Sequence, residues 1–174
     1  REDEQRGPTE LVLEKASELY DRREVEYPVD FAMELTMMMM SQSVREAGEQ
    51  LVNWANRRYG LGWTTETLVK STPKATRELL IEASRTFLAE KRLEKAIEAA
   101  QATPGDAALE EHLQKEYGTG MTDSMRYLEG QERADAIRAR VENILRAELL
   151  HLERTILLDT LDQSWKDHLY AMDQ

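Results

Sequence analysis

The chain has 174 residues, a length that suits one domain or one domain with an extension. Its formal net charge of −11 argues against binding to nucleic acid, because the phosphate backbone would be repelled. Cysteine is absent, which excludes disulfides, thiolate nucleophiles and cysteine-based zinc sites.

The ends of the chain suggest a piece of a longer protein. The sequence begins without Met and stops at Gln174 within a helical pattern. No signal peptide is recognisable, and no apolar run approaches the roughly 18 residues of a membrane-spanning helix. Residues 1–8 are polar and end in Gly-Pro, so we expect a flexible leader there.

Helical patterns follow the leader. Thr9 is a candidate cap for a helix that runs to about Glu26. Pro28 suits the first turn of a second helix, which the pattern continues as far as Tyr59. Gly48 is the point at which this second helix could bend.

The middle of the chain has clear start and stop signals. A short helical turn is predicted to begin at Thr64 or Thr65 and end at Val69. The sequence Ser71-Thr72-Pro73 predicts the start of a helix over 74–102. Thr103-Pro104-Gly105-Asp106 then separates it from a short helix over 107–117, and a capped turn is predicted over 122–128.

The last 44 residues, 131–174, contain neither Pro nor Gly. They predict one uninterrupted helix, which would be about 65 Å long. The fold class is therefore all-α, with a small helical array over 9–130 packed beside one long C-terminal helix over 131–174. No segment gives a comparable strand signal.

Two similar hexapeptides indicate an internal repeat. Tyr59-Gly-Leu-Gly-Trp-Thr64 and Tyr117-Gly-Thr-Gly-Met-Thr122 are each followed by a short turn, a break and a long helix. We interpret both as glycine helix stops followed by a threonine cap, since neither has the lysine and preceding strand of a phosphate-binding loop. A duplicated helical hairpin would explain the repeat; the alternative is that acidic amphipathic helices generally resemble one another.

An apolar stripe marks the C-terminal segment. Its members recur at spacings of three and four, which places them on one helix face: Leu158, Leu161, Trp165, His168 or Leu169, and Met172. His168 lies next to Asp167, but no nucleophile is in register with it, so we interpret it as a packing residue. Glu148-x-x-His151 is a single copy of a pattern that metal-binding bundles use twice. We therefore expect no catalytic, cofactor-binding or metal site in this chain.

Methionines are concentrated at Met33 and over 37–40. Methionine adapts to irregular apolar partners, so this patch is either core filler or an interaction surface. In the second case Met37, Met39 and Met40 are the candidate peptide contacts. That interpretation supports an alternative function for the chain, a free-standing helical protein-interaction or chaperone-like module.

The C-terminal stripe resembles one particular family. The segment that carries the resemblance reads Glu153-Arg-x-Ile-Leu-Leu-x-x-Leu-Asp-x-x-Trp-Lys-Asp-His-Leu-x-x-Met-Asp173, and it is similar to the first helix of the two-helix finger in SecA, the ATP-driven motor of bacterial preprotein export. The hexapeptide at Tyr59 resembles, more loosely, the short turn of the SecA helical wing domain. The wing of most family members is shorter than the segment that precedes residue 131 here, so the resemblance implies an enlarged wing.

The resemblance implies a non-catalytic role for this chain. ATP and Mg²⁺ would bind in motor domains that lie outside it, and the chain itself would need no cofactor. Its partners would be the rest of the SecA motor, the preprotein and the SecYEG channel, with docking, preprotein clamping and regulation as its roles. The parent protein would be cytoplasmic and peripherally associated with the inner membrane. The apolar stripe would be covered by the motor or, in a homodimer, by a second copy of the chain.

Overall fold

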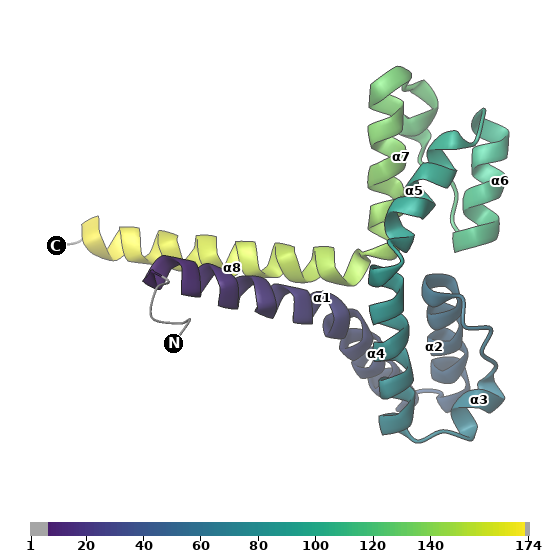
Figure 1. Ribbon diagram of the computed structural model, residues 1–174, viewed down its shortest axis with the longest axis horizontal. Helices are drawn as coiled ribbons and strands as arrows, with labels where there is room; N and C mark the ends of the chain where they lie inside the picture. Colours follow the sequence, from purple (N-terminus) through teal and green to yellow (C-terminus); the bar gives the residue numbers. More distant parts are fainter. Residues whose placement is uncertain (1–6, 173–174) are drawn as a thin grey trace. The chain divides into compact units, whose positions relative to one another are not determined.

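The computed structural model describes residues 7–172, apart from the side chain of Leu169, and all of its regular elements are helices (Figure 1). The all-α prediction is confirmed. In chain order the elements are α1 (Pro8–Met40), α2 (Val44–Tyr59), α3 (Thr65–Val69), α4 (Pro73–Ala89), α5 (Arg92–Ala102), α6 (Asp106–Tyr117), the 3-10 helix η2 (Asp123–Tyr127), α7 (Gly130–Leu145) and α8 (Ala147–Met172).

The chain forms two compact units that meet between Lys95 and Ala96, inside α5. This boundary between compact units differs from the domain boundary between residues 130 and 131 that the sequence suggested. The predicted domain boundary stays a prediction. The flexible leader predicted over 1–8 lies outside the described residues except for its last two positions. Of these, Gly7 caps α1 and Pro8 is its first residue.

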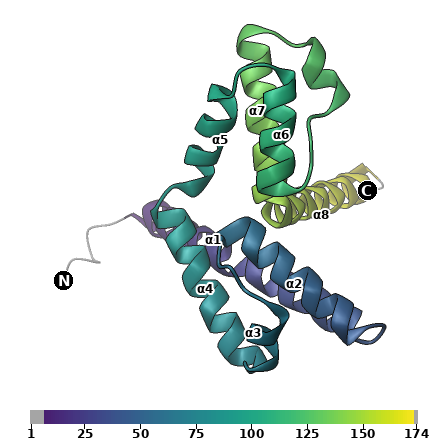
Figure 2. The ribbon, with the colours of Figure 1, turned by 90° about the vertical axis from the view of Figure 1, so that its right-hand side faces the viewer.

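The first unit is built on α1, which packs against both α2 and α4. Figure 2 shows α3 at the connection between α2 and α4. Helices α1, α2 and α4 supply the buried core, which contains Val29, Ala32, Ala47, Leu51, Val52, Ala55, Tyr59, Leu80, Ile81 and Phe87. Arg77 on α4 adds a two-pronged ion pair to Asp30 on α1, with N–O distances of 2.7 and 3.1 Å.

The prediction that Pro28 restarts a helix is wrong, because α1 runs through it without interruption. Proline inside a helix removes one backbone hydrogen bond and costs about 3 kcal/mol. Here Pro28 and its neighbour Val29 are fully buried in the core of the first unit, so packing offsets that cost.

The predicted continuity between Pro28 and Tyr59 is also wrong, because the chain turns after Met40. Ser43 ends the turn as the N-cap of α2, and its hydroxyl accepts a hydrogen bond from the Glu46 N–H at 3.3 Å. Serine followed three residues later by glutamate is a recognised helix-start signal, so the sequence did carry this boundary.

Two helices predicted to be continuous are interrupted. The helix predicted over 74–102 breaks at Lys91, and the long C-terminal helix breaks at Arg146. Neither break involves Pro or Gly, so no local signal announced it. Side-chain contacts accompany both breaks: Arg92 donates to the Tyr59 carbonyl at 2.8 Å, and Arg146 pairs with Glu153 at 3.1 Å.

The predicted cap at Thr9 is wrong, because Gly7 is the N-cap of α1 and Thr9 lies inside the helix. Other short-range start and stop signals are confirmed. Thr72 caps α4 by accepting a hydrogen bond from the Ala75 N–H at 3.2 Å.

Gly60 and Gly118 end α2 and α6 in the left-handed conformation, with φ of 67° and 68°. The two similar hexapeptides thus end their helices in the same way at the first glycine, but they differ at the second, since Gly62 has a φ of 64° and Gly120 has no positive φ. Their origin by duplication stays a prediction.

The second unit packs α5, α6, η2 and α7 around an apolar core, which contains Ile97, Ala100, Leu109, Leu113, Met125, Ile137, Val141, Leu145 and Leu149. Arginines from α7 hold the surrounding loops. Arg133 pairs with Asp106 at 2.7 Å, and Arg140 donates to the Gly120 carbonyl at 2.9 Å. Leu149 is the last core residue, so only the first turn of α8 belongs to this core.

Candidate interaction surfaces

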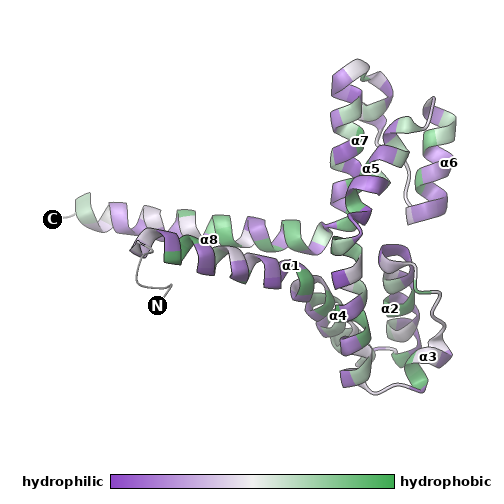
Figure 3. Ribbon diagram, viewed as in Figure 1, coloured by the Kyte–Doolittle hydropathy of each residue, from purple (hydrophilic) through white to green (hydrophobic). Residues whose placement is uncertain are grey.

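The outer part of α8 is an amphipathic face without a partner in the described chain. Every described side chain from Arg154 to Met172 is exposed. The predicted stripe residues are 56% to 60% exposed, and they are Leu158, Leu161, Trp165 and Met172. Figure 3 shows hydrophobic positions recurring along this helix. The structure thus leaves the stripe uncovered, and what packs on it stays a prediction.

His168 and Leu169 complete the predicted stripe. The His168 ring lies beside the Trp165 ring, with centroids 6.1 Å apart and planes tilted by 41°. The side chain of Leu169 lies outside the described residues. His168 is exposed on the helix surface, and its role as a packing residue stays a prediction.

Charged side chains flank the stripe. Lys166 donates to the Asp162 carboxylate, and this hydrogen bond raises the pKa of Lys166 above its ordinary value. On the opposite face of the helix, Gln163 donates to Asp167 at 3.1 Å. The face therefore combines apolar anchors with fixed charges, an arrangement suited to recognition of another protein surface.

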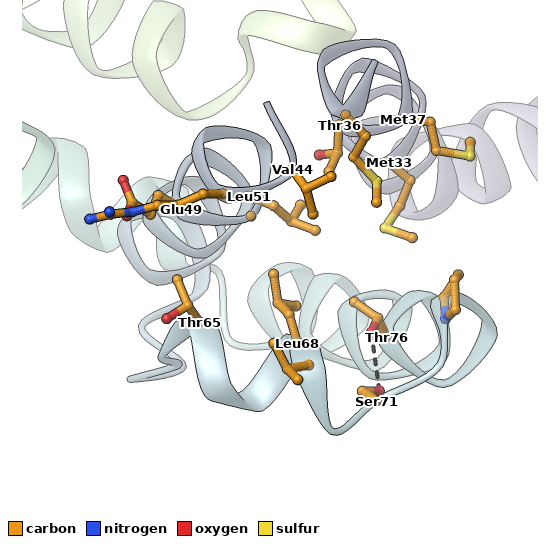
Figure 4. A pocket seen from close by; sticks show the side chains of 15 residues that line it. Met33, Thr36, Met37, Val44, Glu49, Leu51, Thr65, Leu68, Ser71 and Thr76 are labelled. Carbon is orange, nitrogen blue, oxygen red and sulfur yellow. Dashed lines mark hydrogen bonds and ion pairs between the residues drawn. The ribbon is translucent and has the colours of Figure 1, made fainter. Parts of the chain in front are cut away.

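A groove of about 850 Å³ opens in the first unit, between α1, α2, α3 and the start of α4 (Figure 4). Figure 4 shows Met33 and Leu51 on one side of the space, with Leu68 and Thr76 on the other. Its lining residues are Met33, Thr36, Met37, Met40, Val44, Arg45, Gly48, Glu49, Leu51, Thr65, Leu68, Val69, Ser71, Pro73 and Thr76. The volume falls within the range of about 300–1,000 Å³ that ligand pockets occupy.

Of the predicted peptide contacts, Met37 and Met40 line the groove. Met39 is half-buried and is not among the lining residues, whereas Met33, which was not among the predicted contacts, is one of them. Met33, Met37 and Met40 are spaced by four and three, so a single face of α1 presents all three. That spacing was readable in the sequence and could have identified Met33.

The charged residues of the groove are Arg45 and Glu49, which form an ion pair at 2.8 Å. The hydrogen bond that Arg45 donates to the Glu49 carboxylate raises the pKa of Arg45 above its ordinary value. Flexible methionine side chains and a largely uncharged wall suit the groove to apolar groups of varied shape.

The sequence analysis missed the far wall of the groove. Leu68 lies close to the backbone of Gly48, where an added Cβ would be 3.9 Å from its Cδ1. Thr76 is buried and donates to the Ser71 hydroxyl at 3.1 Å. The spacing of apolar residues in one helix cannot show which side chains of another helix will face it.

The Glu-x-x-His pattern forms no metal centre in the described part of the chain. Glu148 is buried, whereas His151 is exposed. Within residues 7–172, no group of three or more His, Cys, Asp or Glu side chains is placed to hold a metal ion. Within the same range, no helix has the length and apolar character needed to cross a membrane.

Comparisons with known proteins agree with the resemblance carried by α8. A family model described as the SecA Wing and Scaffold domain matches residues 8–174. The chain is 25% identical over 190 residues to the "Protein translocase subunit SecA 1" of Rhodopirellula baltica, an alignment that covers 98% of this chain and 15% of that relative. No solved structure matches the chain significantly. The chain therefore belongs to the SecA wing and scaffold domain family.

Proposed function

We propose that this chain is the non-catalytic wing and scaffold portion of a SecA-type preprotein translocase. Its family and its similarity to a translocase subunit support this role. The observation that carries the proposal is the exposed apolar face of α8, from Leu158 to Met172. A helix with such a face needs a partner, because large exposed apolar patches mark interaction surfaces.

The rest of the motor is the proposed partner of α8. The chain spans about 15% of the length of the curated relative that it matches, so a protein of that kind has ample further surface to cover the helix. Trp165 lies in the middle of the face, and buried tryptophans are among the residues that contribute most to protein interfaces. Through this contact, α8 would dock the chain on the motor and transmit regulation to it.

The activity belongs to the complete protein in this proposal. ATP and Mg²⁺ bind in its motor domains, and hydrolysis drives a preprotein through the SecYEG channel. The protein works in the cytoplasm, peripherally attached to the inner membrane. The chain contributes contact surfaces that flank the preprotein and no catalytic group.

The proposal is tested by preprotein translocation with the complete protein. Trp165→Ala is expected to slow translocation strongly, whereas Gln163→Ala, on the opposite face of α8, is expected to leave the rate unchanged. Equal rates for both variants and the unmodified protein would remove the support for a docking role of α8.

The methionine groove supports a second candidate function, which is the binding of an apolar helical peptide. Such peptides insert residues spaced by three and four into hydrophobic grooves. Three methionines on one face of α1, opposite Leu68, provide a wall that can adjust to different side chains. This function is compatible with a chaperone-like module and with clamping of a preprotein.

Charge placed in the groove tests the second candidate. The double variant Met37→Glu with Met40→Glu is expected to weaken binding of an uncharged, leucine-rich helical peptide at least about 10-fold, because burying a carboxylate in an apolar site is costly. Met38→Glu is the matched control, since Met38 is 71% exposed and is not among the lining residues. Fluorescence anisotropy measures the affinity, and an equal loss in both proteins, or none, would contradict groove binding.

A further inference from the structure

The junction between α4 and α5 contains an unfavourable backbone conformation. Lys91 has φ of 51°, and among the described residues it is the one non-glycine residue with positive φ. L-amino acids with side chains disfavour this left-handed region, because Cβ approaches the following carbonyl oxygen. Lys91 is exposed, so its own side chain is not fixed in this conformation by burial.

The junction also lacks backbone hydrogen bonds that a continuous helix would make. The Glu90 N–H bonds to the Thr86 carbonyl at 2.9 Å, and the next bond of this type runs from the Lys95 N–H to the Lys91 carbonyl at 3.1 Å. Between them, no such bond links Arg92, Leu93 or Glu94 to the preceding turn in the described structure. The sequence over 74–102 contains neither Gly nor Pro and predicts an unbroken helix, so a continuous form is available to the chain.

Two hydrogen bonds donated by the Arg92 side chain, here called the clasp, stabilise the bent form. Arg92 donates from Nη1 to the Tyr59 carbonyl and from Nε to the Glu90 carboxylate, both at 2.8 Å. Tyr59 is the last residue of α2, where the helix dipole attracts a cation. The Tyr59 ring also packs edge-on against Phe87 of α4, with centroids 5.9 Å apart. The end of α2 is thereby linked to both sides of the break.

We infer that the α4–α5 junction is a two-state hinge. In the bent state Arg92 is clasped to the end of α2 and Lys91 is left-handed. In the continuous state the clasp is open, the three missing backbone bonds form, and α4 and α5 become one helix. A partner that binds at the Tyr59–Gly60 turn and displaces Arg92 favours the continuous state. This inference goes beyond the proposed function and does not depend on it.

Spin labels on either side of the junction test the hinge. Glu82 on α4 and Glu98 on α5 are exposed, and cysteines can be introduced at both because the chain has none. Sixteen residues of continuous helix would separate them by about 24 Å, so the fraction of molecules at that distance reports the continuous state. Pulsed electron paramagnetic resonance on the complete chain gives the fraction of each state.

Two opposite substitutions at Lys91 decide the outcome. Lys91→Val is expected to raise the 24 Å fraction at least threefold, because a β-branched residue tolerates positive φ poorly. Lys91→Gly is expected to lower that fraction, since glycine adopts this conformation freely. Arg92→Ala should act like Lys91→Val, with circular dichroism as the check on folding. Distance distributions that are the same for Lys91→Val, Lys91→Gly and the unmodified chain would overturn the hinge, whatever Arg92→Ala does.

Discussion

Replacing Trp165 with alanine in the complete parent protein is expected to weaken docking of α8 by about 2–4 kcal/mol, or roughly 30- to 1,000-fold. The indole is the largest apolar group of the stripe, so its truncation is expected to remove more buried contact area with the partner than any other single change in the stripe. In the described chain Trp165 is 59% exposed on α8, beyond the last core residue. The free energy of unfolding of the chain itself should therefore change by no more than about 0.5 kcal/mol.

Hydrogen exchange of the α8 amides in the complete protein measures this loss. Opening of the docked helix should become 30- to 1,000-fold more frequent in Trp165→Ala, and Gln163→Ala is the matched control on the opposite face. A second copy of the chain is the alternative cover for the stripe. Loss of protection that depends on protein concentration would favour the homodimer over docking on the motor.

Replacing Leu80 with alanine is expected to destabilise the first unit by about 2–5 kcal/mol. Leu80 is fully buried in α4, within the core that α1, α2 and α4 share. Truncation removes the buried methyl groups and leaves a cavity that the neighbouring helices fill only in part. A loss of this size is a large fraction of the stability of an ordinary domain.

The neighbouring leucine provides the control for this prediction. Leu79 is 54% exposed on the same helix, so Leu79→Ala should change the free energy of unfolding by less than about 1 kcal/mol. Urea denaturation followed by circular dichroism measures both variants against the unmodified chain. Equal destabilisation by the two substitutions would contradict the orientation of α4 in the structure.

Capping residues and glycines in the sequence predicted those helix boundaries that depend only on the residues at the boundary itself. Thr72 before a proline, and glycines at 60 and 118, act on their own backbone, so sequence alone located them. The breaks at Lys91 and Arg146 have a different origin. Both lie in segments with good helix propensity. The break at Lys91 coincides with a contact from Arg92 to the distant Tyr59. The break at Arg146 coincides with an ion pair to Glu153 in the next helix. One-dimensional patterns do not contain that information.

The candidate interaction surfaces were likewise only partly predictable from the sequence. The spacing of Leu158, Leu161 and Trp165 predicted one amphipathic face, but spacing cannot tell a face packed in the core from one left uncovered. The methionine cluster predicted an apolar surface at the end of α1. Leu68 closes the groove from another helix, and its position follows only from how α1, α2 and α3 pack.

The central claim is that the rest of a SecA-type motor covers the apolar face of α8. Thiol labelling at Leu161→Cys and Gln163→Cys tests it most directly, because this chain has no cysteine of its own. Mass spectrometry of the α8 peptide gives the labelling rate at each position, in the isolated chain and in the complete protein. We expect similar rates at the two positions in the isolated chain, and at least about 10-fold slower labelling at 161 than at 163 in the complete protein. Equal labelling at both positions in the complete protein would contradict the claim.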